Sequence, residues 1–398
     1  MKIAIFSDTH CGFKYGEERG EDSFIAMNEA MDKSLDCDII LHAGDMFDGK
    51  VPKPEVYSRT AKILSRAHSV SSNAKLIEST KEVSPLALRG IPVVTIHGTH
   101  ERRSGEMINP LQSLEKSGLI IHLDSSSVVF DVNGEKVAIH GMSGVSEKYA
   151  KEVLDKWNPQ PVVGAINIFM FHQSVEPYIY SPLDPPTIKL SDLPKGFDLY
   201  ILGHIHWSDI QNLHSGKFLL TGSTTPTSIH KNEVEQAKYI FKYDGKEIEK
   251  VKLENQRKIM IEEFEVGAGV KDRIANFLNT LSVENPKQIV MIKIKGTLPK
   301  DVPQPNFRDL EERYKDKFIL YINKNVESQD FEDKLDLIKT LNDNRMSPEE
   351  QGIRILESKL GQMNCIINPN EIFDLLVEGN SDMIFNLLTG KQKTLAMI

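Results

Sequence analysis

Short apolar runs that each end in acidic or histidine residues constrain the fold of this chain more than any other feature. Five such runs lie in the first half, at Ile3–Phe6, Ile39–Leu41, Val93–Ile96, Ile166–Phe171 and Leu199–Leu202. They are rich in Ile, Val, Leu and Phe and are bounded by polar or turn residues, which predicts buried strands. Between them, Asp22–Leu35 and Val56–Ala67 carry apolar residues at helical spacing. Strands that alternate with helices indicate a layered α/β fold.

Turn chemistry predicts two hairpins in the rest of this region. Asp131–Gly134 precedes the apolar run Val137–Ile139, and Tyr243–Gly245 precedes Ile248–Val251. Asn-Gly and Asp-Gly pairs between strand-like runs are the strongest short-range hairpin signals. The segment Ser69–Ser84 is rich in Ser and Lys with weak periodicity. We expect it to be a surface insertion that is partly helical.

Beyond about Lys250 the composition changes, and the acidic and histidine motifs do not recur. We expect a smaller α/β domain at Lys258–Asn325, with a helix at Val270–Leu281 and strands at Ile259–Phe264, Ile289–Ile294 and Phe318–Ile322. The mixed-charge segment Glu327–Asn344 is a linker or a helix. In the tail, Ser347–Glu350 is a helix-start signal, and further helices are expected from Pro369 or Asn370 through Leu376 and at Asp382–Leu388.

The composition is that of an ordinary globular protein. The chain has 398 residues, enough for two or three domains, with 40% hydrophobic and 26% charged residues. Its three cysteines, Cys11, Cys37 and Cys365, are far apart, which argues against a disulfide scaffold or a structural zinc site. No signal-peptide pattern opens the sequence, and its longest apolar stretch is too short to span a bilayer. We therefore expect a cytoplasmic protein that does not bind a membrane.

Potential metal ligands follow the five apolar runs directly. The motifs are Asp8-Thr-His10, Gly44-Asp45-Met-Phe-Asp48, Gly98-Thr99-His100-Glu101, His172 and Gly203-His204-Ile-His206. The carboxyl ends of strands converge on the binding crevice in α/β sheets. On an extended segment residues i and i+2 point the same way, so Asp8 and His10 are expected to bind one ion together. Asp45 follows a glycine, where a tight turn can aim its carboxylate between two ions.

Taken singly, each of these motifs has an ordinary explanation. A histidine at a strand end is often a satisfied polar residue, and an aspartate after glycine is often turn chemistry. Their joint occurrence, in order, at the ends of apolar runs favours a metal site. Nitrogen and oxygen ligands without a thiolate suit Mn²⁺, Fe or Zn²⁺. Two such ions can activate water and clamp the oxygens of a phosphoryl group.

The motifs DTH, GDMFD, GTHE, FHQS and GHIH, in this order, resemble the calcineurin-like metallophosphoesterase superfamily over residues 1–225. With the layout that follows, the chain resembles the SbcD-type, or meiotic-recombination-eleven, DNA repair nucleases. The resemblance implies a layered β-sandwich core flanked by helices at 1–250, a small α/β capping domain that binds DNA at 258–325, and a helical C-terminal segment at 345–398. That last segment binds an SMC-like ABC ATPase in the family. A homodimer that holds DNA ends is also implied.

The resemblance also implies a role for each motif residue. Asp8, His10 and His206 would hold the first metal, and His172 and His204 the second, with Asp45 as the bridge. His100 would orient the phosphate and protonate the leaving oxygen. The expected cofactors are two Mn²⁺ ions per subunit, with Fe, Zn²⁺ or Mg²⁺ as alternatives.

The sequence departs from the family pattern at Thr99, where the motif usually has an asparagine that binds the second metal. A threonine hydroxyl is shorter and a weaker ligand than an amide oxygen, so the second metal is expected to be held more loosely. Asp48 is not counted as a primary ligand and is equally well placed to orient a neighbouring histidine. Arg102 and Arg103 follow His100 and either contact DNA phosphates or pair with Glu101 or Glu106. His42, His97 and His140 are expected to be ordinary buried histidines.

Three functions compete at this point. The leading hypothesis is a Mn²⁺-dependent DNA nuclease, acting as a 3′–5′ exonuclease and single-strand endonuclease on double-strand breaks together with an SMC-like ABC ATPase. A nucleotide phosphodiesterase on the same fold is one alternative, although it would not need a capping domain and an apolar helical tail. A scaffold that binds DNA ends with weak nuclease activity is the other, and Thr99 favours it. The net charge of −9 means that any DNA-binding site must be local.

Overall fold

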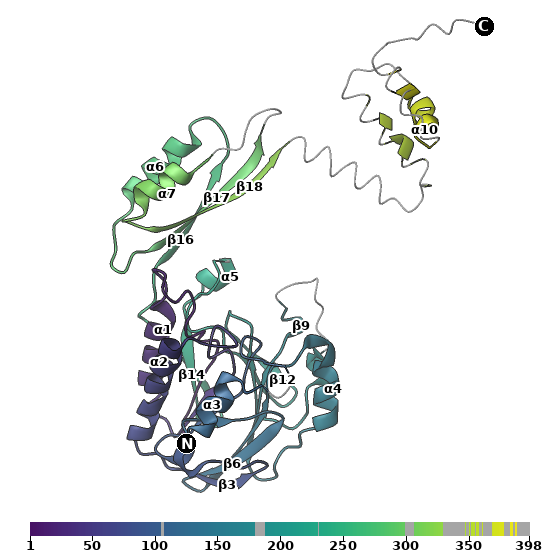
Figure 1. Cartoon of the computed structure of the whole chain (residues 1–398). Coiled ribbons are helices and arrows are strands. Elements are labelled where there is room, and N and C mark those ends of the chain that lie inside the picture. The colour runs from purple at the N-terminus through teal and green to yellow at the C-terminus, as the bar shows by residue number, and fades with distance from the viewer. Residues whose placement is uncertain are drawn as a thin grey trace, which may run out of the picture. The chain divides into compact units, whose positions relative to one another are not determined.

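The computed structural model describes residues 1–104, 107–179, 188–229, 231–298 and 306–328, and separate positions between 347 and 387. The chain divides into two compact units (Figure 1). The first contains Met1–Ile259 and Pro286–Gln288, and the second contains Met260–Asn285 and Ile289–Ile398. Among the described residues, no helix is both long and apolar enough to cross a membrane.

A six-stranded sheet of the first unit contains three of the five predicted strands. Its order is β15 (Ile248–Lys252), β14 (Tyr239–Tyr243), β1 (Ile3–Phe6), β2 (Ile39–His42), β4 (Val93–Thr95) and β5 (Ile121–His122). Strands β1, β2, β4 and β5 are parallel. Strand β14 is antiparallel to both β1 and β15, and the β14–β15 hairpin is the one that the turn chemistry predicted.

The other two predicted strands lie in a seven-stranded sheet. Its order is β12 (Asp209–Leu213), β13 (Gly216–Leu220), β11 (Leu199–Gly203), β8 (Ile166–His172), β7 (Glu135–Met142), β6 (Ser126–Val132) and β3 (Ala74–Ser79). Strands β13, β11, β8 and β7 are parallel. The predicted β6–β7 hairpin turns at Asn133 and Gly134, which both have positive φ angles.

The two sheets pack face to face, because alternate side chains of each strand point to opposite faces. Ile3 and Ile5 belong to the core cluster between the sheets, together with Ile139 and Ile168 of the second sheet. Their neighbour Phe6 points the other way and packs with the helices. Both faces of β1 are therefore apolar, which explains the continuous apolar run in the sequence.

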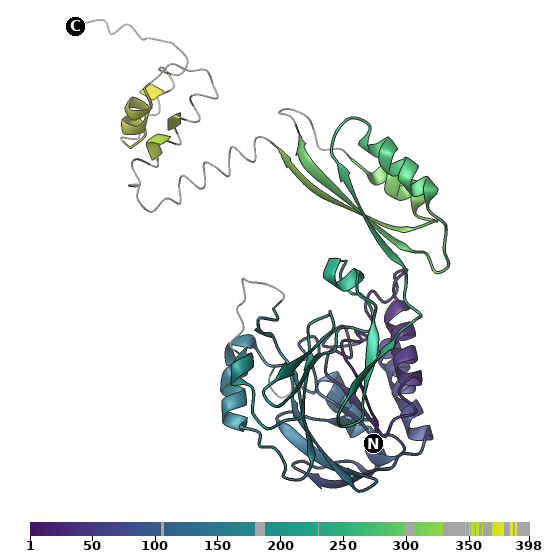
Figure 2. The same cartoon turned by 180° about the vertical axis from the view of Figure 1, so that it is seen from behind.

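Helices cover the outer face of each sheet (Figures 1 and 2). Helices α1 (Asp22–Asp32), α2 (Pro54–Leu64) and α3 (Pro110–Lys116) contribute to the cluster on the six-stranded sheet. Helix α4 (Glu147–Trp157) packs through Ala150 and Leu154 on the seven-stranded sheet. Shorter elements complete this unit: η1 (Ser65–Ser69), η2 (Pro85–Leu88), η3 (Leu190–Asp192), the pair β9 (Val175–Glu176) and β10 (Ile188–Lys189), and α5 (Lys231–Val234). The result is a β-sandwich between helical layers, as expected.

The expectation for Ser69–Ser84 was wrong in one respect. Residues Ala74–Ser79 form the edge strand β3 and not a helix. They pair antiparallel with β6, with a register shift between Leu76 and Glu78. Polar side chains such as Lys75 and Glu78 suit a strand that has a neighbour on one side only. The segment is nevertheless mostly exposed, as an insertion at a sheet edge would be.

The second unit has a three-stranded sheet with two helices. Its strands β16 (Ile259–Glu265), β17 (Ile289–Leu298) and β18 (Ile319–Ser328) lie in that order, and β17 and β18 are parallel. Helix α6 (Val270–Thr280) was predicted, whereas α7 (Arg308–Tyr314) was not. Ile274 of α6 and Leu310 of α7 share a core with β17, so this unit has a core of its own.

Part of the predicted tail lies within the described residues. The Ser347 amide donates to Glu350 Oε2 at 2.8 Å and the Glu350 amide donates to Ser347 Oγ at 3.2 Å, which is the reciprocal pair of a helix start. Helix α10 spans Pro369–Val377, as predicted. Of the third predicted helix, Met383, Ile384 and Leu387 are described, and they are helical. The predicted linker lies outside the described residues from 329 onward.

Candidate metal centre

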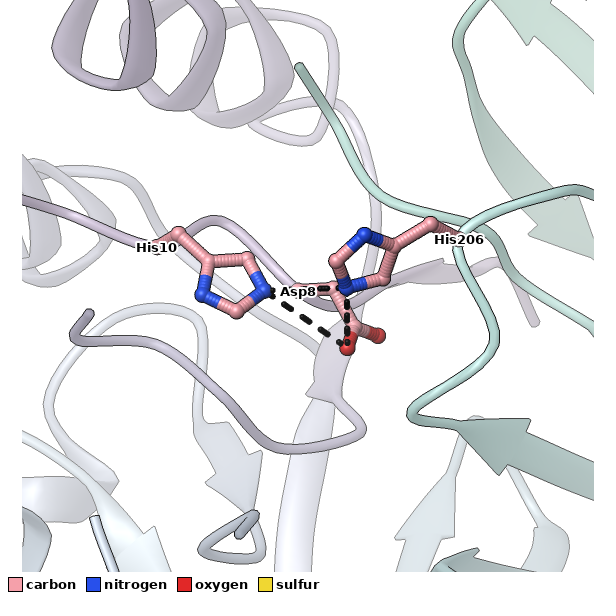
Figure 3. A group of neighbouring side chains, drawn as sticks. All are labelled: Asp8, His10 and His206. Atoms are coloured by element: carbon pink, nitrogen blue, oxygen red, sulfur yellow. Dashed lines mark hydrogen bonds and ion pairs between the residues drawn. The ribbon is translucent and has the colours of Figure 1, made fainter. Parts of the chain in front are cut away.

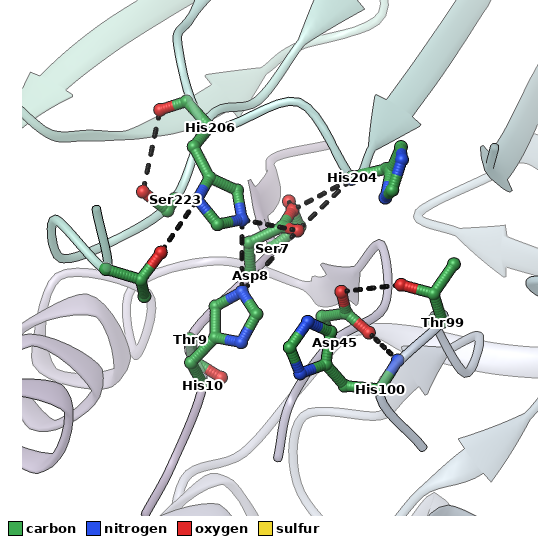
Figure 4. Close-up of polar contacts among 12 residues, drawn as sticks. Ser7, Asp8, Thr9, His10, Asp45, Thr99, His100, His204, His206 and Ser223 are labelled. Atoms are coloured by element: carbon green, nitrogen blue, oxygen red, sulfur yellow. Dashed lines mark hydrogen bonds and ion pairs between the residues drawn. The ribbon is translucent and has the colours of Figure 1, made fainter. Parts of the chain in front are cut away.

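The ends of five strands from both sheets meet at one place. Asp8 and His10 follow β1, Asp45 and Asp48 follow β2, Thr99 and His100 follow β4, His172 is the last residue of β8, and His204 and His206 follow β11. The Ala43 carbonyl after β2 accepts a hydrogen bond from the His172 ring, which joins the two sheets at this end. Figure 4 shows the side chains from β1, β2, β4 and β11 turned toward one another.

Asp8, His10 and His206 form one group of potential ligands (Figure 3). The Nε2 atoms of His10 and His206 are 3.1 Å apart. Asp8 Oδ1 is 3.6 Å from His206 Nε2 and 4.0 Å from His10 Nε2. Asp8 and His10 are buried. These are the three residues that the sequence assigned to a first ion.

Asp45, His172 and His204 form a second group. His172 Nε2 lies 3.2 Å from Asp45 Oδ2, and the same Asp45 oxygen is 3.4 Å from the Thr99 hydroxyl. The two groups are adjacent, because the His204 amide donates to both Asp8 carboxylate oxygens at 3.1 and 3.2 Å. Among the described groups, Asp45 belongs only to the second, so its bridging role remains a prediction.

The backbone at these positions differs from what the spacing suggested. Asp8, His10, Asp45 and His204 have φ angles of 50°, 42°, 52° and 85°. They are therefore in or near the left-handed region and not extended. Asp8 and His10 meet because the chain turns after β1. The prediction that they lie together is confirmed, but the extended conformation from which it was argued was wrong. The tight turn expected after Gly44 is present, with φ of 94° at Gly44.

Three glycines make room for the second group. A Cβ atom on Gly98 would lie 2.1 Å from Asp45 Oδ1, and one on Gly44 would lie 2.4 Å from His172 Nδ1. A Cβ on Gly203 would lie 2.0 Å from the Ala43 carbonyl oxygen. Because such distances are far below van der Waals contact, only glycine allows the three turns to approach the ligands this closely.

Each of the four histidines has a hydrogen-bonding or charged neighbour for its second ring nitrogen. His172 Nδ1 lies 2.8 Å from the Ala43 carbonyl oxygen, and His206 Nδ1 lies 3.3 Å from Glu233 Oε1. His10 Nδ1 lies 3.4 Å from Asp48 Oδ1, and His204 Nε2 lies 3.1 Å from the Ser174 hydroxyl. A carbonyl or carboxylate can only accept, so it holds the proton on the facing nitrogen and leaves a lone pair on the other. For His172 and His206, the nitrogen left to bind an ion is therefore Nε2, which faces Asp45 and Asp8.

Glu233, Ser174 and Thr227 were missed by the sequence reasoning. Glu233 is in the short helix α5, more than twenty residues after the last motif, and has the appearance of an ordinary surface acid. No spacing rule links it to His206. Asp48, in contrast, was expected to orient a histidine, and it contacts both His10 and His100.

The charges of the two central carboxylates are strongly linked to the histidines. Burial raises the pKa of Asp8, and the charge of Asp45 acts in the same direction. Burial also disfavours the charged form of Asp45, but His172 beside it holds the Asp45 pKa well below its usual range. Although burial opposes it, Asp45 with Asp8 raises the pKa of His172 to about 10. A proton on His172 thus compensates the negative charge of the two carboxylates, a role that a bound cation would take over.

His100 is the most exposed member of the cluster, with 44% of its side chain accessible. Its amide donates to Asp45 Oδ1 at 2.8 Å, and its Nδ1 lies 3.0 Å from the Asp48 carbonyl oxygen. Because that carbonyl only accepts, the proton is held on Nδ1 and the Nε2 lone pair points away from it. His10, Asp48 and His100 also form a third group of neighbouring ligand atoms, with His10 shared.

Arg102 and Arg103 line a cavity of about 720 Å³ together with Lys50, and no residue of the three ligand groups lines it. The alternative pairing with Glu101 is excluded, because Glu101 is buried and accepts from the amides of Phe47 and Gly98. Glu106 lies outside the described residues. Arg103 also donates to the Ile108 carbonyl oxygen at 3.0 Å, so it is tied to its own loop.

The remaining histidines in strand-like runs are ordinary buried residues, as predicted. His42 lies 3.1 Å from the Thr9 hydroxyl, His97 pairs with His122, and His140 packs edge-on against Phe197. Burial lowers the pKa of His42 to about 3 and that of His140 to about 4, so both stay neutral. The described thiols Cys11 and Cys37 are not part of the three ligand groups.

The donor set fits two metal ions. It combines carboxylate oxygens and imidazole nitrogens in adjacent buried groups, with the imidazole protons on His172 and His206 held on the far side of the rings. This ligand type suits first-row divalent ions, although it does not distinguish among them.

Comparisons with known proteins agree with this geometry. The sequence model of the calcineurin-like phosphoesterase family matches residues 1–208, just over half of the chain. The chain is 30% identical over 244 residues to the "DNA double-strand break repair protein Mre11" of Sulfolobus acidocaldarius, which covers 59% of this chain and 57% of that protein. It is 26% identical over 245 residues to the protein of the same name from Methanopyrus kandleri, with 57% and 49% covered.

A eukaryotic relative is also similar. The "Double-strand break repair protein MRE11" of Encephalitozoon cuniculi is 25% identical over 307 residues, covering 69% of this chain and 52% of that protein. This chain spans about half the length of the curated relatives that it matches.

Proposed function

This chain belongs to the calcineurin-like phosphoesterase family, and on that premise we propose that it is a Mn²⁺-dependent DNA nuclease that processes double-strand breaks. We propose both 3′–5′ exonuclease and single-strand endonuclease activity. The observation that carries this proposal is the pair of adjacent, largely buried ligand groups at the ends of four strands. The similarity to double-strand break repair proteins supports DNA as the substrate.

We assign the ligands as follows. Asp8, His10 and His206 would hold the first ion, and Asp45, Thr99, His172 and His204 would hold the second, with Asp45 shared between them. Two such ions would supply activation of a water molecule and compensation of the negative charge on the phosphoryl oxygens. The protein contributes the rigid turns and the outer hydrogen bonds that orient the histidine rings.

His100 is our candidate for the catalytic histidine. Its contact with the Asp48 carbonyl holds the proton on Nδ1, so Nε2 is available to contact the phosphate or, once protonated, to give a proton to the leaving oxygen. Its exposure fits a group that must reach substrate.

Arg102, Arg103 and Lys50 are the candidate DNA contacts. All three line one cavity, and Arg102 and Arg103 follow His100 closely in the chain, so they are placed to meet the phosphates that flank a bound phosphodiester. Positive side chains that neutralise phosphates contribute much of the affinity of a protein for DNA. A local patch of this kind also accounts for DNA binding by a chain with a net charge of −9.

We propose that the chain forms a homodimer, that the second unit caps the nuclease and contacts DNA, and that the C-terminal helices bind an SMC-like ABC ATPase. We expect the assembly to act in the cytoplasm at the nucleoid.

A cleavage assay tests the proposal. Linear duplex and single-stranded DNA are incubated with the chain in Mn²⁺ or Mg²⁺, and the same assay is run on His100→Ala. His214→Ala is the matched control, because His214 is an exposed histidine on the β12–β13 turn, outside the ligand groups. We expect cleavage in Mn²⁺ that is lost with His100→Ala and kept with His214→Ala.

One observation favours a second candidate function. Thr99 contributes only a hydroxyl, which already lies 3.4 Å from Asp45 Oδ2. This weakens the case that the second ion is tightly bound. A DNA-end scaffold with weak nuclease activity is therefore the alternative. DNA binding with no cleavage by the parent protein in either metal would favour the scaffold over the nuclease.

A further inference from the structure

A buried carboxylate lies behind the His206 ring, outside every motif of the sequence. Glu233 of α5 is 2% exposed. Its Oε1 is 3.3 Å from His206 Nδ1 and accepts from the Thr227 amide at 2.7 Å and the Ser223 hydroxyl at 3.3 Å. Figure 4 shows His206 between Asp8 on one side and Ser223 on the other. Glu233 therefore connects the outer side of a ligand histidine to a separate loop.

Two groups compete for the His206 Nδ1 atom, and they do not have the same chemical effect. The Thr227 hydroxyl is closer, at 2.9 Å, but a hydroxyl can donate or accept and is compatible with either ring tautomer. A carboxylate can only accept, so a lone pair on Nδ1 facing Glu233 at 3.3 Å would be repelled. Of the two groups at Nδ1, only Glu233 therefore requires the ring proton to be on that atom.

We propose that Glu233 is a positioning residue for the first metal: its carboxylate holds the His206 proton on Nδ1 and so presents the Nε2 lone pair beside Asp8 and His10. This inference rests on the proposed metal centre. The acceptor also makes the imidazole more electron-rich, which strengthens its bond to a cation.

The surroundings keep the carboxylate in place. Ser228 donates to Glu233 Oε2 from its amide at 3.2 Å and from its hydroxyl. Lys238 Nζ is 4.0 Å from Glu233 Oε1 and donates to the His206 carbonyl oxygen at 3.0 Å. Because Lys238 fixes the His206 backbone while Glu233 orients its ring, both halves of this ligand are held from one segment, residues 233–238.

The effect should be confined to one of the two ions. The corresponding ring nitrogen of His172, in the second group, faces the Ala43 carbonyl oxygen and not a carboxylate side chain. Loss of the Glu233 charge leaves that contact intact. A merely structural role in the 223–228 loop predicts no such selectivity, because loosening the loop does not change the lone pair on His206.

Mn²⁺ binding by the full-length chain tests the proposal, measured by isothermal titration calorimetry on metal-free protein. The variants are Glu233→Gln, which keeps the size and removes the charge, and Thr227→Val, which removes the hydroxyl. Glu235→Gln is the matched control, because it removes the same charge from an exposed position two residues away. We expect Glu233→Gln to weaken one of two Mn²⁺ sites about tenfold or more, with smaller effects for Thr227→Val and none for Glu235→Gln.

A second measurement does not depend on any variant that must fold. In metal-free protein labelled with ¹⁵N-histidine, the nitrogen shifts of His206 report its tautomer, and we expect the proton on Nδ1. A His206 proton on Nε2, or unchanged affinity of both Mn²⁺ sites in Glu233→Gln, overturns the proposal. Fewer than two Mn²⁺ ions on the parent protein removes the proposed metal centre itself, before any variant is compared.

Discussion

Single residues at the candidate metal centre adopt backbone conformations that the fold does not require. Asp8, His10, Asp45 and His204 all have positive φ angles, where a residue with a Cβ is destabilised by about 1–2 kcal/mol. Glycine or asparagine would adopt this conformation more easily, but glycine supplies no ligand and asparagine no charge. Strain of this kind clusters at functional sites and is consistent with side chains aimed at bound ions.

Thr99 is the residue at which the site departs from the family pattern, so a variant with asparagine at this position should be informative. We expect Thr99→Asn to lower the Mn²⁺ concentration that gives half-maximal nuclease activity. An amide oxygen reaches further than the Thr99 hydroxyl, which now lies 3.4 Å from Asp45 Oδ2. One added interaction of about 1 kcal/mol would lower the half-maximal Mn²⁺ concentration about fivefold. Activity is measured over a Mn²⁺ series with both proteins.

A matched variant separates ligand chemistry from side-chain size at this position. Thr99→Val has nearly the same shape as threonine but offers no oxygen, so it should raise the half-maximal Mn²⁺ concentration. An unchanged concentration in both variants would mean that position 99 does not contribute to metal binding.

The turns after the strands are the elements that build the site, and glycine is their common feature. Gly98 is the clearest case. Its φ angle is not positive, so glycine is needed there only because a Cβ atom would not fit. A methyl group there would meet both the Asp45 carboxylate and the Asp45 amide nitrogen, at 2.1 and 2.5 Å. The β4 turn and the β2 turn can approach each other only without it.

Gly98→Ala should consequently displace Asp45. We expect at least about a tenfold loss of affinity for one Mn²⁺ ion and destabilisation of about 1–3 kcal/mol from overpacking. Calorimetric Mn²⁺ titration and thermal melting measure the two effects. Gly49→Ala is the control, since a Cβ on Gly49 meets nothing within 4 Å. If the two alanine variants behave alike, the close approach at Gly98 is not needed for metal binding.

The elements also show what could be predicted from sequence. The five strands were recognised because both faces of each are buried, and the hairpins because Asn-Gly and Asp-Gly require particular turns. Helix α4 was missed although Ala150, Leu154 and Trp157 lie at helical spacing. Helix α7 spans seven residues with one buried pair, Leu310 and Tyr314, which is too short for a periodic signal.

The site shows the same division. Its candidate ligands follow strands and could be found from motif order, whereas some of their hydrogen-bonding partners come from distant segments. Glu233 contacts His206 through tertiary structure alone, with no fixed spacing to the motifs, and Ser174, although it ends the FHQS motif, contacts His204 from a different strand end. The left-handed turns could not be anticipated either, because Asp-x-His spacing is also compatible with an extended strand.

At the scale of the whole molecule, the ligand groups belong entirely to the first of two units that have separate cores. Metal binding should therefore stabilise one unit and not the other. At a free concentration of about 100 times the dissociation constant, a bound ion adds about 2.7 kcal/mol of stability. We expect calorimetric melting to show two transitions, of which addition of a chelator lowers only that of the first unit.

Separate transitions can be assigned with a variant that changes one core. Ile274→Ala removes a buried side chain from the core of the second unit and should lower the free energy of unfolding of that unit by about 2–5 kcal/mol. The melting temperature that falls should be the one that the chelator leaves unchanged. A chelator that shifts both transitions equally would contradict independent units.

The C-terminal helices offer an apolar surface that fits a partner. In α10, Ile372 is buried, whereas Leu376 and Val377 are 52% and 73% exposed, and Met383 further on is 55% exposed. Exposed apolar side chains on a short helix are typical of a helix that docks into a groove on another protein. This feature supports the proposed contact with an SMC-like ABC ATPase.

Truncation after Asp343 tests that contact. We expect Mn²⁺-dependent cleavage to survive, because the ligand groups and His100 lie in the first unit, and binding to the ATPase to be lost. Co-purification and titration with the ATPase from the same organism measure the second effect. Leu376→Asp in the full chain is the finer test, because it places a charge on the exposed apolar face and should weaken binding by about 2 kcal/mol or more if that face is central to the interface. Undiminished ATPase binding by the truncated chain would move the interface to another part of the molecule, while loss of cleavage would show that the tail also acts on the nuclease.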